Sequence, residues 1–451
     1  MRRNFMTAIL VGLSLYAMAD DVPFVVTNGL FDSNIKETFG LEYAPGTETY
    51  TVFTAAEGTD HYANGVVMAA FKGNLYCMWQ SSAKDEDATD TWVAYSRSTD
   101  GGKTWSAPMV LCPTIADGYC SSGGWLSTGD KLIGYINTWP SNLSPKGGYT
   151  RYVESTDGLT WTDPSVVKMA DGSQLNGIFE QDPHVLPDGR IVGAAHFQPG
   201  LKICPIYTDD PYGVSGWKKG NFTYTANGDQ SAELEPSLFR KPDGTLVMTF
   251  RDQKGSYSVL AATSKDRGET WSKAEKTNMP DSRAKQSAGN LPDGTAFICN
   301  NPGRVVNSNN KTWRVPLAIT LSADGETFDH AYLLRSGLEG DYPSLRYEGK
   351  SKTLGYSYPK AMVYGDYLYV SYATNKDDAQ FTRVPINNIA LNTSIHMVHM
   401  GNGTIEAFDM RGMKVAMASS KDFDINTLPK GMYIIKVKTE GGVHTRKIIL
   451  K

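Results

Sequence analysis

Apolar and polar residues alternate in short stretches along the chain, and a turn rich in Gly and Asp separates the stretches of each pair. Residues 191–195 and 246–250 are two examples, and each follows a Pro-Asp-Gly turn. Such alternation bounded by Gly and Asp is typical of a β-hairpin. The turns occupy residues 72–74, 128–130, 187–189, 242–244, 292–294 and 364–366. The pattern therefore predicts six hairpins.

A second repeat, Ser-x-Asp-x-Gly-x-Thr-Trp, falls between these hairpins. It is complete at residues 98–105 and 264–271, one residue shorter at 155–161 and 322–328, and degenerate at 208–217. The starting positions 98, 155, 208, 264 and 322 are 57, 53, 56 and 58 residues apart. Ser and Asp side chains can hold the amides of a tight turn, Gly supplies positive φ, and Trp can pack on a neighbouring sheet. We expect these residues to be structural rather than catalytic.

The two repeats together predict an all-β protein of six four-stranded units. Radial repetition of such units gives a six-bladed β-propeller, which we place at residues 25–388. After about Asn388 neither repeat continues, and residues 405–415, 428–437 and 447–451 have the pattern of short strands. A small C-terminal β-sandwich module at residues 392–451 follows from that pattern.

The order and spacing of these tail segments resemble the C-terminal sorting module of type IX secretion substrates. The resemblance implies export machinery as a partner, and it leaves open whether the module is cleaved. An unrelated accessory sandwich is the alternative interpretation.

The first residues have the features of a signal peptide. Arg2 and Arg3 are followed by an apolar core at residues 8–15 and by Ala17-Met18-Ala19, so we assign residues 1–19 to an export signal. A buried N-terminal strand is the alternative. The apolar core is too short to span a bilayer, and no other segment approaches a membrane span. We expect a secreted, periplasmic or cell-surface protein.

Composition narrows the classes of partner. The 451 residues are 40% hydrophobic and 20% charged with a formal net charge of −4, which gives no electrostatic reason to expect nucleic acid. The five cysteines contain no Cys-x-x-Cys pair, so they predict neither a zinc site nor a disulfide framework. Cys112 and Cys120 either bridge a local loop or stay as buried thiols. We expect a monomer with no metal and no cofactor.

The repeat register predicts which polar residues meet at one face of the propeller. Positions seven residues after each Gly/Asp turn, and about nine before it, are expected to lie near the central axis at the end opposite the turns. The first set is Gln80, Asn137, His196, Arg251, Asn301 and Tyr372; the second is His61, Glu180, Glu235 with Glu233, and Tyr356 with Tyr358. Polar groups that converge at the mouth of a closed scaffold indicate a binding or active site.

Two stretches within residues 30–385 resemble sialidases. Residues 234–252 match the segment that supplies a glutamate and then a clamp arginine, here Glu235 and Arg251, and residues 355–358 match the segment that supplies a tyrosine nucleophile. Arg314 stands where those enzymes place a further arginine. Asp87, or neighbouring Asp85, stands near their acid/base aspartate.

The resemblance implies a division of labour among these residues. Tyr356 would attack, Glu235 would act as its base, and Asp87 would protonate the leaving oxygen. Arg251 and Arg314 would hold the substrate carboxylate bidentately. We place His196, Gln80, Asn301 and Tyr358 among the substrate contacts, and we expect Lys285 and Lys376 to be solvated.

One family motif is absent. Sialidases carry Arg-Ile-Pro on the first inner strand, whereas this chain has Asp60-His61-Tyr62-Ala63-Asn64-Gly65 there. His61 resembles the histidine of divergent propeller glycosidases and lyases that act at uronic acids or deoxysugars such as rhamnose, although a hydrogen-bonded structural role is equally compatible with it. The function hypothesis is an exo-acting glycoside hydrolase on glycans with a terminal acidic or deoxy sugar. A non-catalytic glycan-binding propeller and an adhesive surface protein are the alternatives, and the sequence does not name the sugar.

Overall fold

The computed structural model describes residues 22–303, 305–306, 312–341, 344–392, 404–419, 427–439 and 442–450. Secondary structure in these residues is β throughout, apart from one 3-10 turn, η1 (Ile386–Asn388). The predicted all-β class is confirmed. The predicted signal peptide, residues 1–19, lies outside the described residues.

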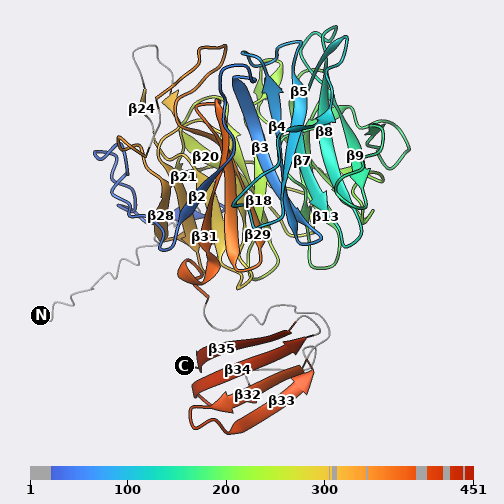
Figure 1. The fold of residues 1–451 in the computed structure, drawn as a ribbon. Helices are drawn as coiled ribbons and strands as arrows, with labels where there is room; N and C mark the ends of the chain where they lie inside the picture. Colours follow the sequence, from blue (N-terminus) through green and yellow to red (C-terminus); the bar gives the residue numbers. More distant parts are fainter. Residues whose placement is uncertain are drawn as a thin grey trace, which may run out of the picture.

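Six antiparallel sheets follow one another along the chain (Figure 1). The first three comprise β3 (Tyr62–Phe71), β4 (Asn74–Ser82), β5 (Trp92–Ser98) and β6 (Met109–Cys112); β7 (Gly118–Ser127), β8 (Leu132–Pro140), β9 (Tyr149–Ser155) and β10 (Ser165–Val166); and β11 (Gly177–Phe179), β12 (His184–Val185), β13 (Ile191–Phe197), β14 (Lys202–Thr208) and β15 (Lys218–Lys219). The last three comprise β18 (Glu233–Arg240), β19 (Leu246–Asp252), β20 (Ser258–Ser264) and β21 (Glu275–Pro280); β22 (Ser287–Asn290), β23 (Ala296–Asn300), β26 (Leu317–Ser322) and β28 (His330–Arg335); and β29 (Tyr356–Tyr364), β30 (Tyr367–Thr374), β31 (Asp378–Pro385) and β2 (Glu48–Phe53). Each of the six predicted Gly/Asp turns joins the first two strand positions of one sheet.

Three short strand pairs lie outside these sheets. β1 (Val25–Val26) runs parallel to β27 (Thr327–Phe328), β16 (Ala226–Asn227) pairs with β17 (Gln230–Ser231), and β24 (Val305–Val306) pairs with β25 (Thr312–Trp313).

The sixth sheet takes its outer strand from the other end of the chain. β2 pairs antiparallel with β31, with Glu48 opposite Arg383 and Tyr50 opposite Phe381. Arg383 Nε also donates a 2.7 Å hydrogen bond to Glu48 Oε2. The sheet therefore needs no second hairpin, which explains why no Ser-x-Asp turn follows the last Gly/Asp turn in the sequence.

Strands of neighbouring sheets contact one another all the way round the six sheets, and the third sheet contributes β11 on one side and β13 on the other. β3 contacts β7, β7 contacts β11, β13 contacts β18, β18 contacts β22, β22 contacts β29, and β29 contacts β3. All six sheets also line one central cavity of about 740 Å³, to which they contribute Met68, Trp125, His184, Ser237, Ser287 and Met362 among others. One cavity is therefore shared by residues from all six sheets.

The Ser-x-Asp turns make the hydrogen bonds that their residues predict. Gly102 N donates to Ser98 Oγ (2.9 Å), Thr104 N donates to Asp100 Oδ1 (3.0 Å), and Trp105 Nε1 donates to Gly102 O (3.0 Å). Gly102 has φ +90°, and a Cβ at this position would lie 2.7 Å from the Phe381 ring of the sixth sheet. The turn thus requires glycine, and it joins one sheet to the next as a structural element.

The C-terminal residues form one four-stranded antiparallel sheet in the order β33-β32-β34-β35. Its strands are β32 (Thr404–Asp409), β33 (Lys414–Ser419), β34 (Gly431–Thr439) and β35 (Gly442–Leu450). A sandwich needs a second layer, and residues 404–419, 427–439 and 442–450 supply a single sheet, so the predicted sandwich is not what these residues form. In the described part of the chain, no helix has the length and hydropathy that crossing a bilayer requires.

Candidate active site

A bulge interrupts the first strand of the fourth and sixth sheets at the end far from the Gly/Asp turn. In β18 the register moves from Leu234 opposite Arg251 to Ser237 opposite Thr249, and in β29 it moves from Ser357 opposite Ala373 to Lys360 opposite Ser371. Glu235 and Tyr358 fall inside these bulges and have positive φ values of 50° and 57°. A bulge re-aims the side chain that it contains, and a left-handed conformation away from glycine costs on the order of 1 kcal/mol. Such local strain is typical of functional sites.

Glu235 is held from two sides. Its Oε2 lies 2.9 Å from Arg251 Nη1, and its backbone N donates to His196 Nε2 at 3.2 Å. Burial lowers the pKa of His196, so the ring is neutral and can accept this hydrogen bond. Burial also raises the pKa of Glu235, but the charges of Arg251 and Lys285 outweigh it and hold the pKa at about 2. Glu235 is therefore a carboxylate.

Cations surround Tyr358. Arg314 Nη2 donates to the Tyr358 hydroxyl at 3.3 Å, and its guanidinium carbon lies 4.2 Å from the ring centroid. The ammonium groups of Lys285 and Lys376 lie 5.0 and 5.4 Å from the same centroid. Burial raises the pKa of Tyr358, but Arg314, Lys376 and Arg251 lower it further than burial raises it, although Glu235 acts in the opposite sense. The net result is a phenol with a pKa below its usual value.

The expectation that Lys285 and Lys376 are solvated is wrong. Their side chains are only 4% and 2% exposed. Lys285 Nζ lies 2.5 Å from Glu180 Oε2, and Lys376 Nζ lies 3.2 Å from Glu86 Oε1. A carboxylate partner offsets the desolvation of each ammonium group, and both ammonium groups lie near the Tyr358 ring. Both lysines come from loops, where no strand register indicated their direction.

The acidic segment of the first sheet presents two carboxylates to the site. Asp87 Oδ2 pairs with Lys146 at 2.7 Å, and its side chain is 31% exposed. Glu86 Oε1 accepts a hydrogen bond from Asn64 Nδ2 at 3.2 Å. Burial raises the pKa of Tyr62 well above its ordinary value, and the charges of Glu86, Tyr358 and Asp87 act in the same direction.

Asp85 has a different position. Its Oδ1 accepts a hydrogen bond from the backbone N of Lys350 at 2.6 Å, so it ties two loops together. Of the two aspartates that the sequence offered, only Asp87 is among the charges that raise the pKa of Tyr62.

Tyr356 does not lie where the sequence predicts a nucleophile. Its hydroxyl donates to the backbone oxygens of Ser336 (2.7 Å) and Asp341 (3.0 Å), and the Arg335 guanidinium lies 4.8 Å from its ring centroid. The side chain is fully buried, and burial raises the pKa of Tyr356 well above its ordinary value. Strand alternation places Tyr356 and Tyr358 on one face, but the bulge at Tyr358 separates them. The tyrosine at the Glu235 cluster is Tyr358.

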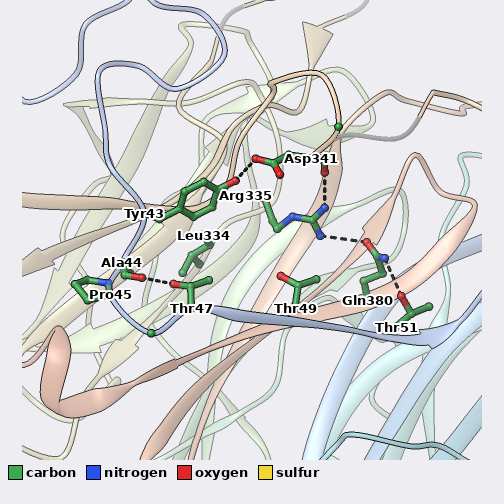
Figure 2. Close-up of a pocket in the computed structure, with 12 residues that line it drawn as sticks. Tyr43, Ala44, Pro45, Thr47, Thr49, Thr51, Leu334, Arg335, Asp341 and Gln380 are labelled. Carbon is green, nitrogen blue, oxygen red and sulfur yellow. Dashed lines mark hydrogen bonds between the residues drawn. The ribbon is translucent and has the colours of Figure 1, made fainter.

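A separate polar pocket of about 600 Å³ lies between β2, β28 and β31 (Figure 2). Its lining includes Arg335 and Asp341, which contact Tyr356. Tyr43 donates to Asp341 at 2.5 Å, Arg335 donates to Gln380 at 3.4 Å, and Gln380 donates to Thr51 at 2.9 Å. None of the site residues predicted from the sequence lines it.

The remaining predicted residues have varied positions. The His61 ring stacks on Tyr347 with centroids 3.8 Å apart, and its Nε2 lies 3.1 Å from Ala56 O, so these contacts place it outside the Glu235 cluster. Asn301 Nδ2 donates to the backbone oxygen of Arg314 at 3.0 Å and so helps to fix the backbone of that residue. Gln80 is buried in β4, opposite Asn64.

Three residues of the two predicted polar sets, which were assigned neither to catalysis nor to substrate binding, have structural roles. Glu233 accepts a hydrogen bond from Thr225 N at 2.8 Å, and Tyr372 shares one of 2.7 Å with Thr382. Asn137 Nδ2 donates to Phe179 O at 2.6 Å and joins the second sheet to the third.

Two buried guanidinium donors in the cluster have no hydrogen-bond acceptor among the residues that the structure describes. They are Arg251 Nε and Arg314 Nη1. Buried polar groups are nearly always satisfied, so an anionic ligand that accepts from both guanidinium groups fits this arrangement. The cluster therefore combines a phenol of lowered pKa, a carboxylate, and guanidinium donors that have no acceptor among the described residues.

Comparison with known proteins gives two family matches and one curated relative. The model of the BNR repeat-like domain matches residues 73–370, and the model of the secretion system C-terminal sorting domain matches residues 385–451. A sialidase of Bacteroides fragilis (strain YCH46) is 24% identical over 312 residues, which cover 60% of this chain. The alignment spans 54% of that relative's length, about half.

Solved structures share the fold. The Hadza microbial sialidase Hz136 matches with a TM-score of 0.57 and 17% identity, covering 75% of this chain and 68% of its own. Trypanosoma rangeli sialidase matches with a TM-score of 0.56 and 13% identity, covering 78% and 61%. A protein of unknown function from Dyadobacter fermentans DSM 18053 matches with 0.57 and 16%, covering 76% and 99%. At these identities the likeness concerns the fold alone.

The two family matches agree with the two resemblances that the sequence motifs indicated. The sorting domain indicates secretion or display at the cell surface and confirms the predicted resemblance of the tail. The first match covers well over half of the chain. The chain belongs to the BNR repeat-like domain family, of sialidase-like fold, and carries a C-terminal sorting domain of the secretion system type.

Proposed function

We propose that this chain is an exported glycoside hydrolase of the sialidase superfamily that removes an acidic terminal sugar from glycans. Its scaffold would be a six-bladed β-propeller at residues 25–388, followed by the sorting module at 392–451. The cycle of contacts between neighbouring sheets supports the propeller, and the shared fold with sialidases agrees with it. The observation that carries the proposal is the position of Tyr358 among Arg314, Lys285 and Lys376, where the charge of Glu235 also acts on its pKa.

In this proposal Tyr358 is the nucleophile. Its hydroxyl oxygen attacks the anomeric carbon, its proton passes to the Glu235 carboxylate, and the leaving oxygen is protonated by Asp87. Water then attacks the tyrosyl-linked sugar with Asp87 as base, and Glu235 returns the proton to Tyr358. A neutral tyrosine suits a substrate with a carboxylate beside the anomeric carbon, because a carboxylate nucleophile would be repelled. The cations lower the barrier further because they stabilise the charge that develops on the phenol oxygen.

The charge balance of the cluster favours an anion. Four cationic side chains, Arg251, Arg314, Lys285 and Lys376, accompany three carboxylates, Glu235, Glu180 and Glu86, while the charge of Asp87 is balanced by Lys146. A substrate carboxylate would accept from Arg251 Nε and Arg314 Nη1, the two buried donors without a described acceptor. The lysines would supply the positive charge that the absent third arginine provides in sialidases.

A non-catalytic glycan-binding protein is the second candidate. The observation that favours it is the Arg251–Glu235 ion pair, which partly neutralises the clamp in the absence of a ligand. The same pocket would then bind an acidic sugar without cleaving it. Chemistry centred on His61 has less support, since its ring is stacked on Tyr347.

Hydrolysis of fluorogenic glycosides separates these candidates. The full chain is assayed with sialic acid, glucuronic acid, rhamnose and glucose substrates that share one leaving group. We expect turnover of an acidic substrate, a loss of at least about 100-fold in Tyr358→Phe, and near wild-type turnover in the matched control Tyr356→Phe. Turnover by none of the proteins, together with binding of an acidic sugar that survives Tyr358→Phe, would support the binding protein instead.

A further inference from the structure

Cys112 and Cys120 lie side by side between the first and second sheets. Their sulfur atoms are 3.6 Å apart, and the two residues are 1% and 0% exposed. Cys112 ends β6, the outer strand of the first sheet, and Cys120 is in β7, the first strand of the second. We propose that these two cysteines form a disulfide bond in the exported protein, which ties the first two sheets together.

The sulfur positions need little change to form this bond. A disulfide bond is about 2.05 Å long, so the two sulfur atoms must approach by roughly 1.5 Å, which rotation of the side chains can supply. The bond closes a loop of only residues 112–120, and that loop already connects the two strands. Both backbones are fixed by pairing, with Cys112 opposite Val93 and Cys120 opposite Thr138.

Arg151 gives the pair a polar environment. Its Nη2 lies 3.5 Å from Cys112 Sγ and 3.2 Å from Cys120 Sγ, and its Nε donates to Thr138 at 2.7 Å. Contact with Cys120 lowers the pKa of the Cys112 thiol, burial raises it, and the charge of Arg151 lowers it. The lowering effects outweigh burial, so the pKa is about 7. A thiolate is the attacking species in disulfide exchange, and approach of Arg151 as the sheets close favours the thiolate of Cys112.

The other three cysteines lack such a partner. Cys77 and Cys299 belong to different hydrophobic clusters from this pair, and burial raises the pKa of each thiol. Cys204 lies in the third sheet, and burial raises its pKa to about 11. The odd number of cysteines is therefore compatible with one disulfide and three thiols.

The reaction requires an oxidant, and the sorting domain indicates a destination where disulfides persist. The Cys112 thiolate attacks a small-molecule or protein disulfide and releases one thiol, which leaves a mixed disulfide. Cys120 then loses its proton and attacks the Cys112 sulfur, which releases the second thiol. Two electrons pass to the oxidant, and the two protons end on the released thiols. Because both sulfurs are buried, the bond forms while the sheets are still closing.

Refolding with oxidised and reduced glutathione tests the proposal. The denatured full chain is refolded, its free thiols are alkylated under denaturing conditions, and its peptides are analysed by mass spectrometry. We expect a linked Cys112–Cys120 peptide and alkylation of the other three cysteines. Alkylation of all five cysteines, or a link between another pair, would overturn the proposal.

The melting temperature gives a second readout that does not depend on activity. Reduction before refolding should lower the melting temperature of the wild type by about 2–5 °C. The double variant Cys112→Ser/Cys120→Ser should not respond to reductant, whereas the matched control Cys299→Ser should respond like the wild type. An equal response of the double variant and the wild type would contradict the disulfide, and the reduced wild type replaces the double variant if that variant does not fold.

Discussion

Glu235 and Tyr358 occupy the same position in two different sheets. Each lies in a bulge of the first strand, each has a φ near +50°, and each is followed by proline. Gly65 has the same relation to β3, with φ +58° in a bulge between Asn64 and Val67. The scaffold thus repeats one backbone device, and two of its three copies carry the reacting groups of the proposed mechanism.

The acid stability of the protein should depend on Glu235. Its pKa of about 2 in the folded chain is below the ordinary value of 4.5, so its carboxylate contributes stability that is present above pH 4.5 and is lost as the pH falls toward 2. We predict that Glu235→Gln unfolds at a lower temperature than the wild type at pH 7, and that the difference narrows below pH 4.5. Thermal unfolding across this range measures it.

Glu269→Gln is the control for that experiment. Glu269 pairs with Arg190 at 2.7 Å but is 49% exposed, so its loss should change the melting temperature little at any pH. A difference between Glu235→Gln and wild type that is constant from pH 7 to pH 2.5 would contradict the assignment.

His196 should act as a positioning residue for Glu235. Its neutral ring accepts the backbone N–H of Glu235, and Leu at this position would leave that buried donor without its acceptor. We predict that His196→Leu lowers the free energy of unfolding by about 1–3 kcal/mol in urea titrations. His184→Leu, which alters a histidine in the same sheet near the Gly/Asp turn, should leave turnover unchanged. Equal turnover in both variants would indicate that His196 has no role in the site.

The two buried lysines should determine the preference for acidic sugars. Lys376→Met removes one of the cations around Tyr358, and we predict a rise of about tenfold in KM for the acidic substrate, with no change for a neutral sugar. Lys376→Arg keeps the charge and serves as the matched control. If Met and Arg raised KM equally for both substrates, the lysine would be a packing residue only.

Asp281 should make the protein less stable at neutral pH. Burial raises its pKa to about 6, above the ordinary 3.8, so the folded state favours the protonated form and loses stability as the pH rises from about 4 to 6. We predict that Asp281→Asn is more stable than the wild type by about 1–3 kcal/mol at pH 7.5 and gains little at pH 4. Chemical denaturation at the two pH values measures this, and a gain of the same size at both would refute the explanation.

Much of the fold could be predicted from the sequence because it repeats. Six Gly/Asp turns and five Ser-x-Asp turns correspond to real hairpins, and the register placed Arg251, Glu235 and His196 at one end of their sheets. The strand that completes the sixth sheet could not be predicted, because β2 pairs with β31 across more than 300 residues and its sequence carries no repeat signal.

The sequence did not single out Tyr358, the proposed nucleophile, for a local reason. Residues two apart on a strand share a face, so the alternation of Tyr356 and Tyr358 gave no ground to choose between them. The bulge breaks this alternation, and its proline at 359 is the sequence signal that could have been used, since Glu235 is also followed by proline. Lys285 and Lys376 were misjudged because loops have no register, and their burial depends on Glu180 and Glu86 from distant segments.

Covalent trapping tests the central claim most directly. The full chain is incubated with a fluorinated acidic sugar that forms a stable tyrosyl adduct, digested with trypsin, and the peptide of residues 353–360 is sequenced by tandem mass spectrometry, since it contains both tyrosines. We predict that the sugar is attached to Tyr358 and that Tyr358→Phe gives no adduct. An adduct on Tyr356, or an adduct that persists in Tyr358→Phe, would contradict the assignment of the nucleophile.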